Sequence, residues 1–338
     1  MPAILIMIVL MMGLRGSGDA LTPLWFMIVA VVLDAGLNPV FILGLGPAPA
    51  LGIAGAATAT VIANYSSLFA LLAFIYWRDL PLRLRGGELR YLKPDLAILK
   101  TIVRKGLPMG LQMIVVSSSA LATMGLVNRE GVDTTAAFGV ALQLWTYIQM
   151  PAMALSAAAS AMAAQNIGAD KWERVGAITR SGVIYNLVIT GLLVVLLAIA
   201  DRPALALFLG GDSAALPIAR HIQLIGTWSF LLFGVTMVLF GTVRANGAVW
   251  APLVILAIGL VPVRFGWIFG TQHWLGPDAL WTSFPVSALA NLALAAGYYL
   301  NGSWKKAHMR VEELPCEDEC IEEAEATREP GGALNPAG

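Results

Sequence analysis

Arg15-Gly16-Ser17-Gly18 ends one apolar segment of the chain, and Arg244-Ala245-Asn246-Gly247 ends another that lies 229 positions later. Pro23-Leu24 follows the first stretch, and Pro252-Leu253 follows the second at the same spacing. A long internal repeat in a strongly apolar chain is typical of membrane proteins built from two similar halves, most of which are transporters. The repeat therefore predicts a two-lobed bundle of membrane helices.

A second pairing extends the repeat. Ala63-Asn64 and Trp77 match Ala290-Asn291 and Trp304, with an offset of 227. The second copy has about 140 residues of membrane-like sequence ahead of it, whereas the first copy has 14. We therefore expect lobe one to be incomplete and represented by its later helices, with residues 1–14 as the back half of a helix.

The composition is typical of an integral membrane protein. Hydrophobic residues make up 58% of it and charged residues 12%, and the mean hydropathy is +0.76, whereas a soluble domain carries about 25% charged residues. Apolar runs of about 20 residues recur along the chain, which is the length a helix needs to cross the hydrocarbon core. The predicted fold class is an all-α polytopic membrane protein, with the bilayer as a partner and no nucleic acid.

Gly, Pro or charged residues separate the apolar runs and divide the chain into parts. Residues 1–77 are predicted to be the C-terminal part of lobe one, 78–105 a basic linker on the inner membrane surface, 106–304 the whole of lobe two, and 305–338 a disordered acidic tail. We expect about eight full transmembrane helices and one partial one, at 1–14, 22–44, 52–77, 106–128, 134–164, 174–200, 215–242, 250–272 and 279–303.

Lys and Arg gather on one side of the predicted membrane. If the basic linker is cytoplasmic, alternation of the helices places Arg15, Arg244 and Lys305 on the same side. We expect the protein to lie in the inner or plasma membrane. The positive-inside rule then places its C-terminus on the cytoplasmic side. Six helices lie between the two Arg residues of the repeat, so both copies face the same way and the repeat is parallel. The opposite side receives only Arg129, Arg202 and Arg220.

Polar groups in the predicted lobe-one helices suggest a cation or proton site. Asp34 lies near the middle of segment 22–44, and Asn38 follows it by one helical turn. Thr60 and Asn64 have the same spacing in the next segment. A charge at the centre of a helix costs about 2.5–3.5 kcal/mol on insertion scales, so intramembrane acids usually serve a function. Carboxylate, amide and hydroxyl oxygens suit H⁺ or a small hard cation, although Asp34 could instead make a structural hydrogen bond between helices.

A second set of residues predicts a substrate cavity in lobe two. Aromatic, Met and amide side chains bind large amphipathic ligands through stacking and adaptable packing, although ordinary bundle packing explains each of them equally well. Arg264 lies two residues after Pro262, which predicts a kink. Arg264 lines the cavity, pairs with an acid in the part of lobe one that precedes this sequence, or snorkels to the nearer membrane surface. The predicted cavity residues are Gln112, Gln143, Trp145, Tyr147, Gln149, Met150 and Arg264.

No catalytic constellation or ATP-binding motif occurs in the sequence, so we expect no enzyme and transport driven by an ion gradient. Cys316 and Cys320 form Cys-Glu-Asp-Glu-Cys in the tail. A structural zinc site needs four well-placed ligands, so these are expected to be free thiols. We predict no cofactor beyond the coupling ion, a small organic molecule as the partner, and a monomer.

The motifs of this chain resemble those of the MATE (multidrug and toxic compound extrusion) family. The resemblance runs from residue 1 to about 304 and implies twelve helices in two six-helix lobes, with antiport of H⁺ or Na⁺ against organic, often cationic, compounds by alternating access. On that pattern the chain begins late in the fourth helix. The elements that carry the resemblance are Leu14-Arg15-Gly16-Ser17-Gly18-Asp19, Asn38-Pro39, Gly52-Ile53-Ala54-Gly55-Ala56-Ala57-Thr58-Ala59-Thr60, Gly106-Leu107-Pro108 and Ala163-Ala164-Gln165-Asn166-Ile167-Gly168-Ala169.

The family resemblance also implies a lobe-one cation site that this sequence carries in altered form. Asp34 stands where the family usually has Asn, Asn38 stands where it usually has Asp, and Thr60 occupies the Thr position. Some sodium-coupled members place acids at two lobe-two positions, which are Val116 and Phe233 here. We therefore favour proton coupling over sodium coupling.

Two other hypotheses stay open. A flippase for lipid-linked oligosaccharides, from the same superfamily, should line its cavity with several Arg and Lys to bind pyrophosphate, whereas Arg264 alone lies well inside a predicted span. The other hypothesis is an inactive or non-transporting membrane fragment.

Overall fold

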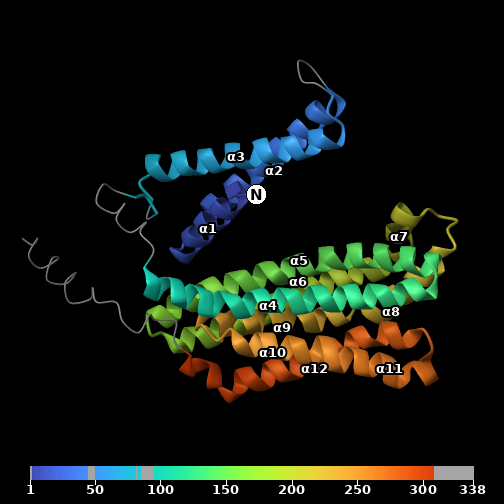
Figure 1. Ribbon diagram of the computed structural model, residues 1–338. Helices are drawn as coiled ribbons and strands as arrows, with labels where there is room; N and C mark the ends of the chain where they lie inside the picture. The colour runs from blue at the N-terminus through green and yellow to red at the C-terminus, as the bar shows by residue number, and fades with distance from the viewer. Residues whose placement is uncertain (1, 45–49, 81, 85–94, 308–338) are drawn as a thin grey trace, which may run out of the picture.

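The computed structural model describes residues 2–44, 50–80, 82–84 and 95–307, and these are helical apart from short turns and connections (Figure 1). Most of the predicted basic linker and of the acidic tail, including Cys316 and Cys320, lies outside the described residues. Helices α1–α3 form a separate group on one side of α4–α12, and α1 slants toward that larger group (Figure 1). These two groups are lobe one and lobe two.

Lobe one consists of three helices. They are α1 (Pro2–Gly16), α2 (Leu21–Leu43) and α3 (Ile53–Trp77). α1 and α3 share a small apolar core in which Leu14 and Leu71 are fully buried. α2 packs on α3 but exposes most of its apolar side chains. Such a surface suits hydrocarbon surroundings, because an isolated helix in lipid already satisfies its own backbone hydrogen bonds.

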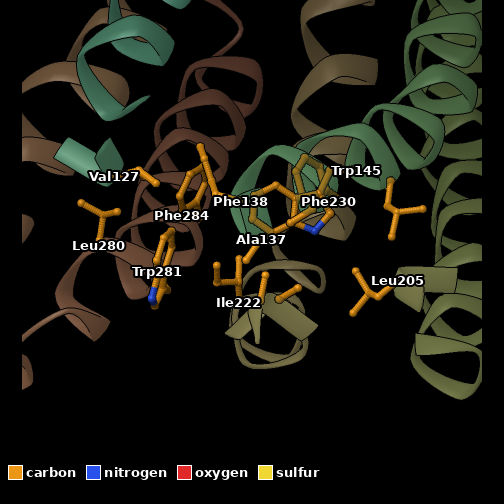
Figure 2. Packing of buried hydrophobic residues seen from close by; sticks show 14 of the residues in the cluster. Val127, Ala137, Phe138, Trp145, Leu205, Ile222, Phe230, Leu280, Trp281 and Phe284 are labelled. Atoms are coloured by element: carbon orange, nitrogen blue, oxygen red, sulfur yellow. The ribbon is translucent and has the colours of Figure 1, made fainter. Parts of the chain in front are cut away.

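Lobe two contains the remaining helices. α9 is its most enclosed helix and packs against α5, α6 and α12. The core of the lobe is aromatic, and Figure 2 shows Phe138 and Trp145 of α5 packed with Phe230 and Phe284. The bounds of the lobe-two helices are α4 (Leu96–Val127), α5 (Val132–Gly168), α6 (Trp172–Ile199), α7 (Asp201–Leu209), α8 (Ala215–Gly226), α9 (Ser229–Ala245), α10 (Trp250–Ile258), a π-turn (Gly259–Val263), α11 (Arg264–Leu275) and α12 (Asp278–Asn301).

Six of the described helices, counting α10 and α11 as one, are long and apolar enough to cross a membrane, and the bent pair α8 and α9 would make a seventh. α5 is 37 residues long, yet it is not among the six. It carries amides, hydroxyls and many small residues along its length, which suits a helix packed among others better than one surrounded by lipid.

The two copies of the repeat form the same local turn in the structure. In each copy an Arg lies in the last turn of a helix, and the backbone N–H of the third following residue donates to its carbonyl, at 3.1 Å for Gly18 and 2.8 Å for Gly247. Both glycines have a left-handed backbone, with φ of 97° and 81°, which glycine adopts without steric cost. The next helices then begin at Leu21 and Trp250, again 229 positions apart.

Four details differ from the sequence expectations. α4 begins at Leu96, ten residues before the predicted segment, so part of the predicted linker is helical. The predicted segment 215–242 is divided between α8 and α9, which meet at 46°. α7 is an additional short helix. The kink expected at Pro262 takes the form of the π-turn between α10 and α11.

Candidate functional site

The two lobes touch where α1 meets α5. Gln165 Nε2 of α5 donates to the carbonyl oxygen of Gly16 at 3.1 Å. Arg15, Lys105, Arg244 and Lys305 lie near this contact, at the end of the described bundle that we call the basic end. There Lys105 Nζ donates to Gly247 O at 2.9 Å, and Asn246 Nδ2 donates to Trp304 O, also at 2.9 Å. These contacts bring together Lys105, the end of α9 and the end of α12, which the sequence assigned to one membrane surface.

The face of α5 that turns toward lobe one follows from the Gln165 contact. Tyr147 precedes Gln165 by 18 residues, which is five helical turns, so both side chains leave the helix in the same direction. Tyr147 and Met150 are 54% and 61% exposed, and Gln143 Nε2 donates to the Tyr147 hydroxyl at 3.1 Å. Gln149 is half-buried beside them. Gln143, Tyr147 and Met150 thus form an exposed patch on the side of lobe two that faces α1.

Trp145 and Gln112 do not belong to that patch. Trp145 is 1% exposed and lies inside the lobe-two core, where its Nε1 donates to Gln223 Oε1 at 2.8 Å and to Thr227 Oγ1 at 3.0 Å. Gly226 packs so closely on the indole that a Cβ there would come within 2.5 Å of the ring. The structure therefore places Trp145 in the core rather than on the wall of a cavity.

Gln112 is also buried, and its Oε1 accepts a hydrogen bond from Arg244 Nη2 at 2.8 Å. That bond ties α4 to the end of α9 and leaves the Gln112 amide oxygen occupied. Arg244 also lies over the Phe240 ring, at 5.8 Å from its centre. The structure thus gives Gln112 a partner inside lobe two, whereas the sequence placed it in the substrate cavity.

The lobe-one residues form two separate pairs. In α2 the Asn38 amide donates to the Asp34 backbone carbonyl at 2.9 Å, so it does not bind the Asp34 carboxylate. In α3 the Asn64 amide donates to the Thr60 carbonyl at 2.7 Å. No hydrogen bond between the described residues joins one pair to the other. α3 instead packs on α2 through its small residues, because Gly55 lies against the carbonyl of Phe41 where no Cβ would fit.

Asp34 nevertheless has the environment of a functional acid. It lies in the middle of α2, and it is the only acidic residue in the interior of a described membrane span. Its Oδ1 is buried and has no hydrogen-bond partner among the described residues. Buried carboxylate oxygens are normally paired, so this oxygen is available to a proton, an ion or a donor group.

Ser67 was not expected from the sequence. Its side chain is fully buried in α3, and its Oγ has no partner in the described part of the chain. It follows Asn64 by three residues and therefore lies on the same side of α3. A serine in an apolar helix gives no signal in the sequence, because most such hydroxyls bond to the preceding turn.

Arg264 lies deep in lobe two. It begins α11 immediately after the π-turn, and its Nε and Nη2 both donate to Ser287 Oγ of α12, at 3.3 and 3.0 Å. Its guanidinium stacks on Phe284 at 4.5 Å from the ring centre. Arg264 is eleven residues from the end of α11 at Leu275, which is about 16 Å along the helix. The contacts with Ser287 and Phe284 hold the guanidinium at that depth, so Arg264 does not snorkel.

Metal-binding clusters of His, Cys, Asp and Glu do not occur among the described residues. The oxygen atoms near the middle of lobe one come from one carboxylate, with amides and hydroxyls on the neighbouring turns. Such a set fits a proton or a monovalent hard cation better than a transition metal, which prefers imidazole or thiolate ligands.

Known proteins share both this sequence and this fold. The sequence profile of the MatE family matches residues 108–267. A probable multidrug resistance protein of Bacillus subtilis (strain 168), YoeA, is 38% identical over 295 residues, which is 87% of this chain and 63% of the relative. Over most of its length the chain is thus similar to the MATE family of transporters.

Two further matches agree with this similarity to MATE proteins. A second Bacillus subtilis protein with the same description, YpnP, is 32% identical over 88% of this chain and 65% of its own length. A crystal structure of a mutant of the Vibrio cholerae MATE transporter VcmN superposes with a TM-score of 0.77 over 87% of this chain and 65% of that one, at 19% identity. The chain therefore has the two-lobed MATE fold, and it spans just under two thirds of the length of these relatives.

The lobe-two positions at which some MATE proteins carry acids are apolar in the structure. Val116 is 40% exposed on α4, and Phe233 packs against the aromatic core. Neither offers an oxygen ligand. Of the site residues that the family resemblance suggested, Asp34 is the acid, and one of its carboxylate oxygens is buried without a partner in the described chain.

Proposed function

We propose that this chain carries out secondary transport, in which it exports organic compounds, cationic ones among them, in exchange for H⁺, with Na⁺ as the alternative coupling ion. The observation that carries the proposal is Asp34, an acid in the interior of a membrane helix with one buried carboxylate oxygen that has no partner in the described chain. Similarity to a family whose named relatives are multidrug resistance proteins supports the same proposal.

The coupling step needs a group that binds and releases the ion. The unpartnered Oδ1 of Asp34 is the atom in lobe one that we assign to this binding. As the lobes move, Asp34 would bind the ion on one side of the membrane and release it on the other. Asn38 bonds to the backbone carbonyl of Asp34 itself and can stabilise that turn of α2, and Asn64 does the same for its own turn of α3.

Alternating access needs two rigid bodies with a contact that can open. The described lobes meet at α1 and α5 near the basic end, which we propose to be cytoplasmic by the positive-inside rule. The patch of Gln143, Tyr147 and Met150 lies on the lobe-two side that faces this junction. An aromatic ring and a flexible thioether suit planar organic cations through cation–π contacts and adaptable packing.

The decisive experiment replaces Asp34. In proteoliposomes loaded with a cationic fluorescent dye, an imposed pH gradient should drive dye export by the unmodified protein, and Asp34→Asn should reduce export to the passive leak. Asp133→Asn is the matched control, because Asp133 is an exposed acid in the first turn of α5. Repeating the assay with a sodium gradient separates H⁺ from Na⁺ coupling.

The outcomes also separate the rival hypotheses. Unchanged export by Asp34→Asn would remove this residue from coupling, and the absence of gradient-driven export by the unmodified protein would favour a non-transporting membrane protein. Export of a lipid-linked sugar instead of the dye would favour the flippase. Arg264 is the one basic residue at mid-depth of a described span, which leaves such a flippase without the several cations its pyrophosphate would need.

A further inference from the structure

The guanidinium of Arg264 has no acidic partner among the residues that the structure describes. No carboxylate lies within ion-pair distance of it among the described residues, and the partners it has are a hydroxyl and an aromatic ring. Its Nη1 makes no hydrogen bond to the described chain, and the side chain as a whole keeps part of its surface accessible. A cation in the middle of a membrane protein normally pairs with an anion or faces a water-filled pathway.

The surroundings of Arg264 hold its side chain in place. Ser287 accepts from the guanidinium at two nitrogens and donates its own proton to the Phe284 carbonyl at 3.0 Å. The Phe284 ring lies under the guanidinium and in turn packs on Trp145 at 5.2 Å between ring centres. The guanidinium is therefore held between α11 and α12, next to Phe284 of the aromatic core.

The internal repeat relates Arg264 to Asp34. Asp34 is the fourteenth residue of α2, and Arg264 is the fifteenth residue counted from the start of α10. A π-turn accommodates one more residue than an α-helical turn, and α10 runs into α11 through one such turn. The two residues thus occupy corresponding positions in the two lobes, one with a carboxylate and the other with a guanidinium.

We propose that Arg264 binds the anionic group of the transported compound, and that the substrate class therefore includes organic compounds that carry a carboxylate. This inference rests on the proposed transport function. The free Nη1 provides the charge-assisted hydrogen bonds, for which a planar carboxylate is the matching partner.

The test compares one dye in two forms: a xanthene dye with a free carboxylate, and the methyl ester of the same dye. Equilibrium binding of each to the purified protein in detergent is followed by fluorescence anisotropy. Arg264→Gln should weaken binding of the acid by about tenfold or more and leave binding of the ester within about twofold, because a hydrogen bond to a charged group is lost only for the acid. Arg129→Gln, an exposed arginine between α4 and α5, is the matched control.

Two further variants guard against a folding defect. Arg264→Lys keeps the charge but loses the planar fork, so it should restore part of the acid binding. Ser287→Ala releases the guanidinium from one partner and should weaken acid binding less than Arg264→Gln does. A variant that binds the ester as the unmodified protein does has a folded lobe two. Equal losses of acid and ester, or no loss of either, would overturn the proposal.

The dye pair also separates this inference from the transport proposal. If gradient-driven export of the ester is observed while acid binding is independent of Arg264, transport stands and the role of Arg264 is wrong. If Arg264 controls acid binding but neither dye is exported, the binding site stands and the transport proposal fails.

Discussion

Asp19 lies between α1 and α2 and stabilises the first turn of α2. Its Oδ1 accepts hydrogen bonds from the backbone N–H groups of Leu21 and Thr22, at 3.1 and 3.0 Å. Hydrogen bonds from Thr22, first its side chain and then its backbone, lower the pKa of the Asp19 carboxyl below its ordinary value of 3.8. The ionised form is therefore the one that stabilises the folded chain.

We predict that Asp19→Ala lowers the stability of the purified protein at neutral pH by roughly 0.5–1 kcal/mol, the low end for helix caps because the carboxyl is largely exposed. Since the folded-state pKa is depressed, the contribution is fully present above about pH 4 and is lost as the pH falls through the folded-state value. Thermal unfolding from pH 7 to pH 3 tests this. Asp19→Asn keeps a capping oxygen but does not titrate, so the pH dependence of its stability should resemble that of Asp19→Ala. A difference in stability between Asp19→Ala and the unmodified protein that stays constant down to pH 3 would contradict the prediction.

The π-turn is an element whose backbone is supported by another helix. Ser119 of α4 donates its hydroxyl proton to the Leu260 carbonyl at 3.0 Å, and Ser119 is 3% exposed. On the opposite flank Asn291 of α12 lies so close to Gly259 that no Cβ would fit there. The π-turn thus fits between α4 and α12, and it fixes the direction in which α11 and Arg264 leave it.

We predict that Ser119→Ala lowers stability by about 1–3 kcal/mol, because it leaves a buried carbonyl without its partner. Ser118→Ala should have little effect, because Ser118 is the exposed neighbour on the same helix. Chemical or thermal unfolding in detergent measures both. Equal stability of the two variants would show that the π-turn does not need the Ser119 hydroxyl.

The bend between α8 and α9 shows why one predicted helix became two. The Thr227 hydroxyl donates to Gln223 Oε1, and Trp145 Nε1 donates to both Gln223 Oε1 and Thr227 Oγ1. The Ser229 hydroxyl donates to the Gly226 carbonyl at 2.6 Å. Hydroxyl groups that bond to nearby backbone carbonyls compete with regular helix. The sequence shows the polar residues but not the indole, which comes from a helix 78 residues away.

At the scale of the whole molecule, Gln165 and Gly16 mark where the lobes are in contact. If the lobes separate at the basic end during transport, a covalent link there should stop it. We predict that Gly16→Cys with Gln165→Cys, in a background with Cys316 and Cys320 replaced by Ser, loses most of its dye export on treatment with a short bifunctional thiol reagent.

The two single-cysteine variants serve as controls, since each can react with the reagent without joining the lobes. Both should keep their export after treatment. A cross-linked double variant that still exports dye at the rate of the untreated protein would show that the lobes do not part at this contact.

The sequence by itself determined the helical class, the positions of most helices and the local turn that the two copies of the repeat share. These depend on local properties: the length of apolar runs, and the turn chemistry of Gly18 and Gly247, whose backbone preferences act within a few residues. It also singled out Asp34 and Arg264, because a charge within an apolar run is visible without any knowledge of its neighbours.

Only the tertiary structure decided what each polar side chain faces. Gln112 binds Arg244, 132 residues away, and Trp145 is enclosed by the core, although both have the residue types expected of a substrate cavity. Helical periodicity gives the residues that share a face, but the neighbour of that face depends on how helices far apart in the sequence pack. For the same reason the sequence left open whether Arg264 reaches the membrane surface, which the contacts with Ser287 and Phe284 in the middle of lobe two decide.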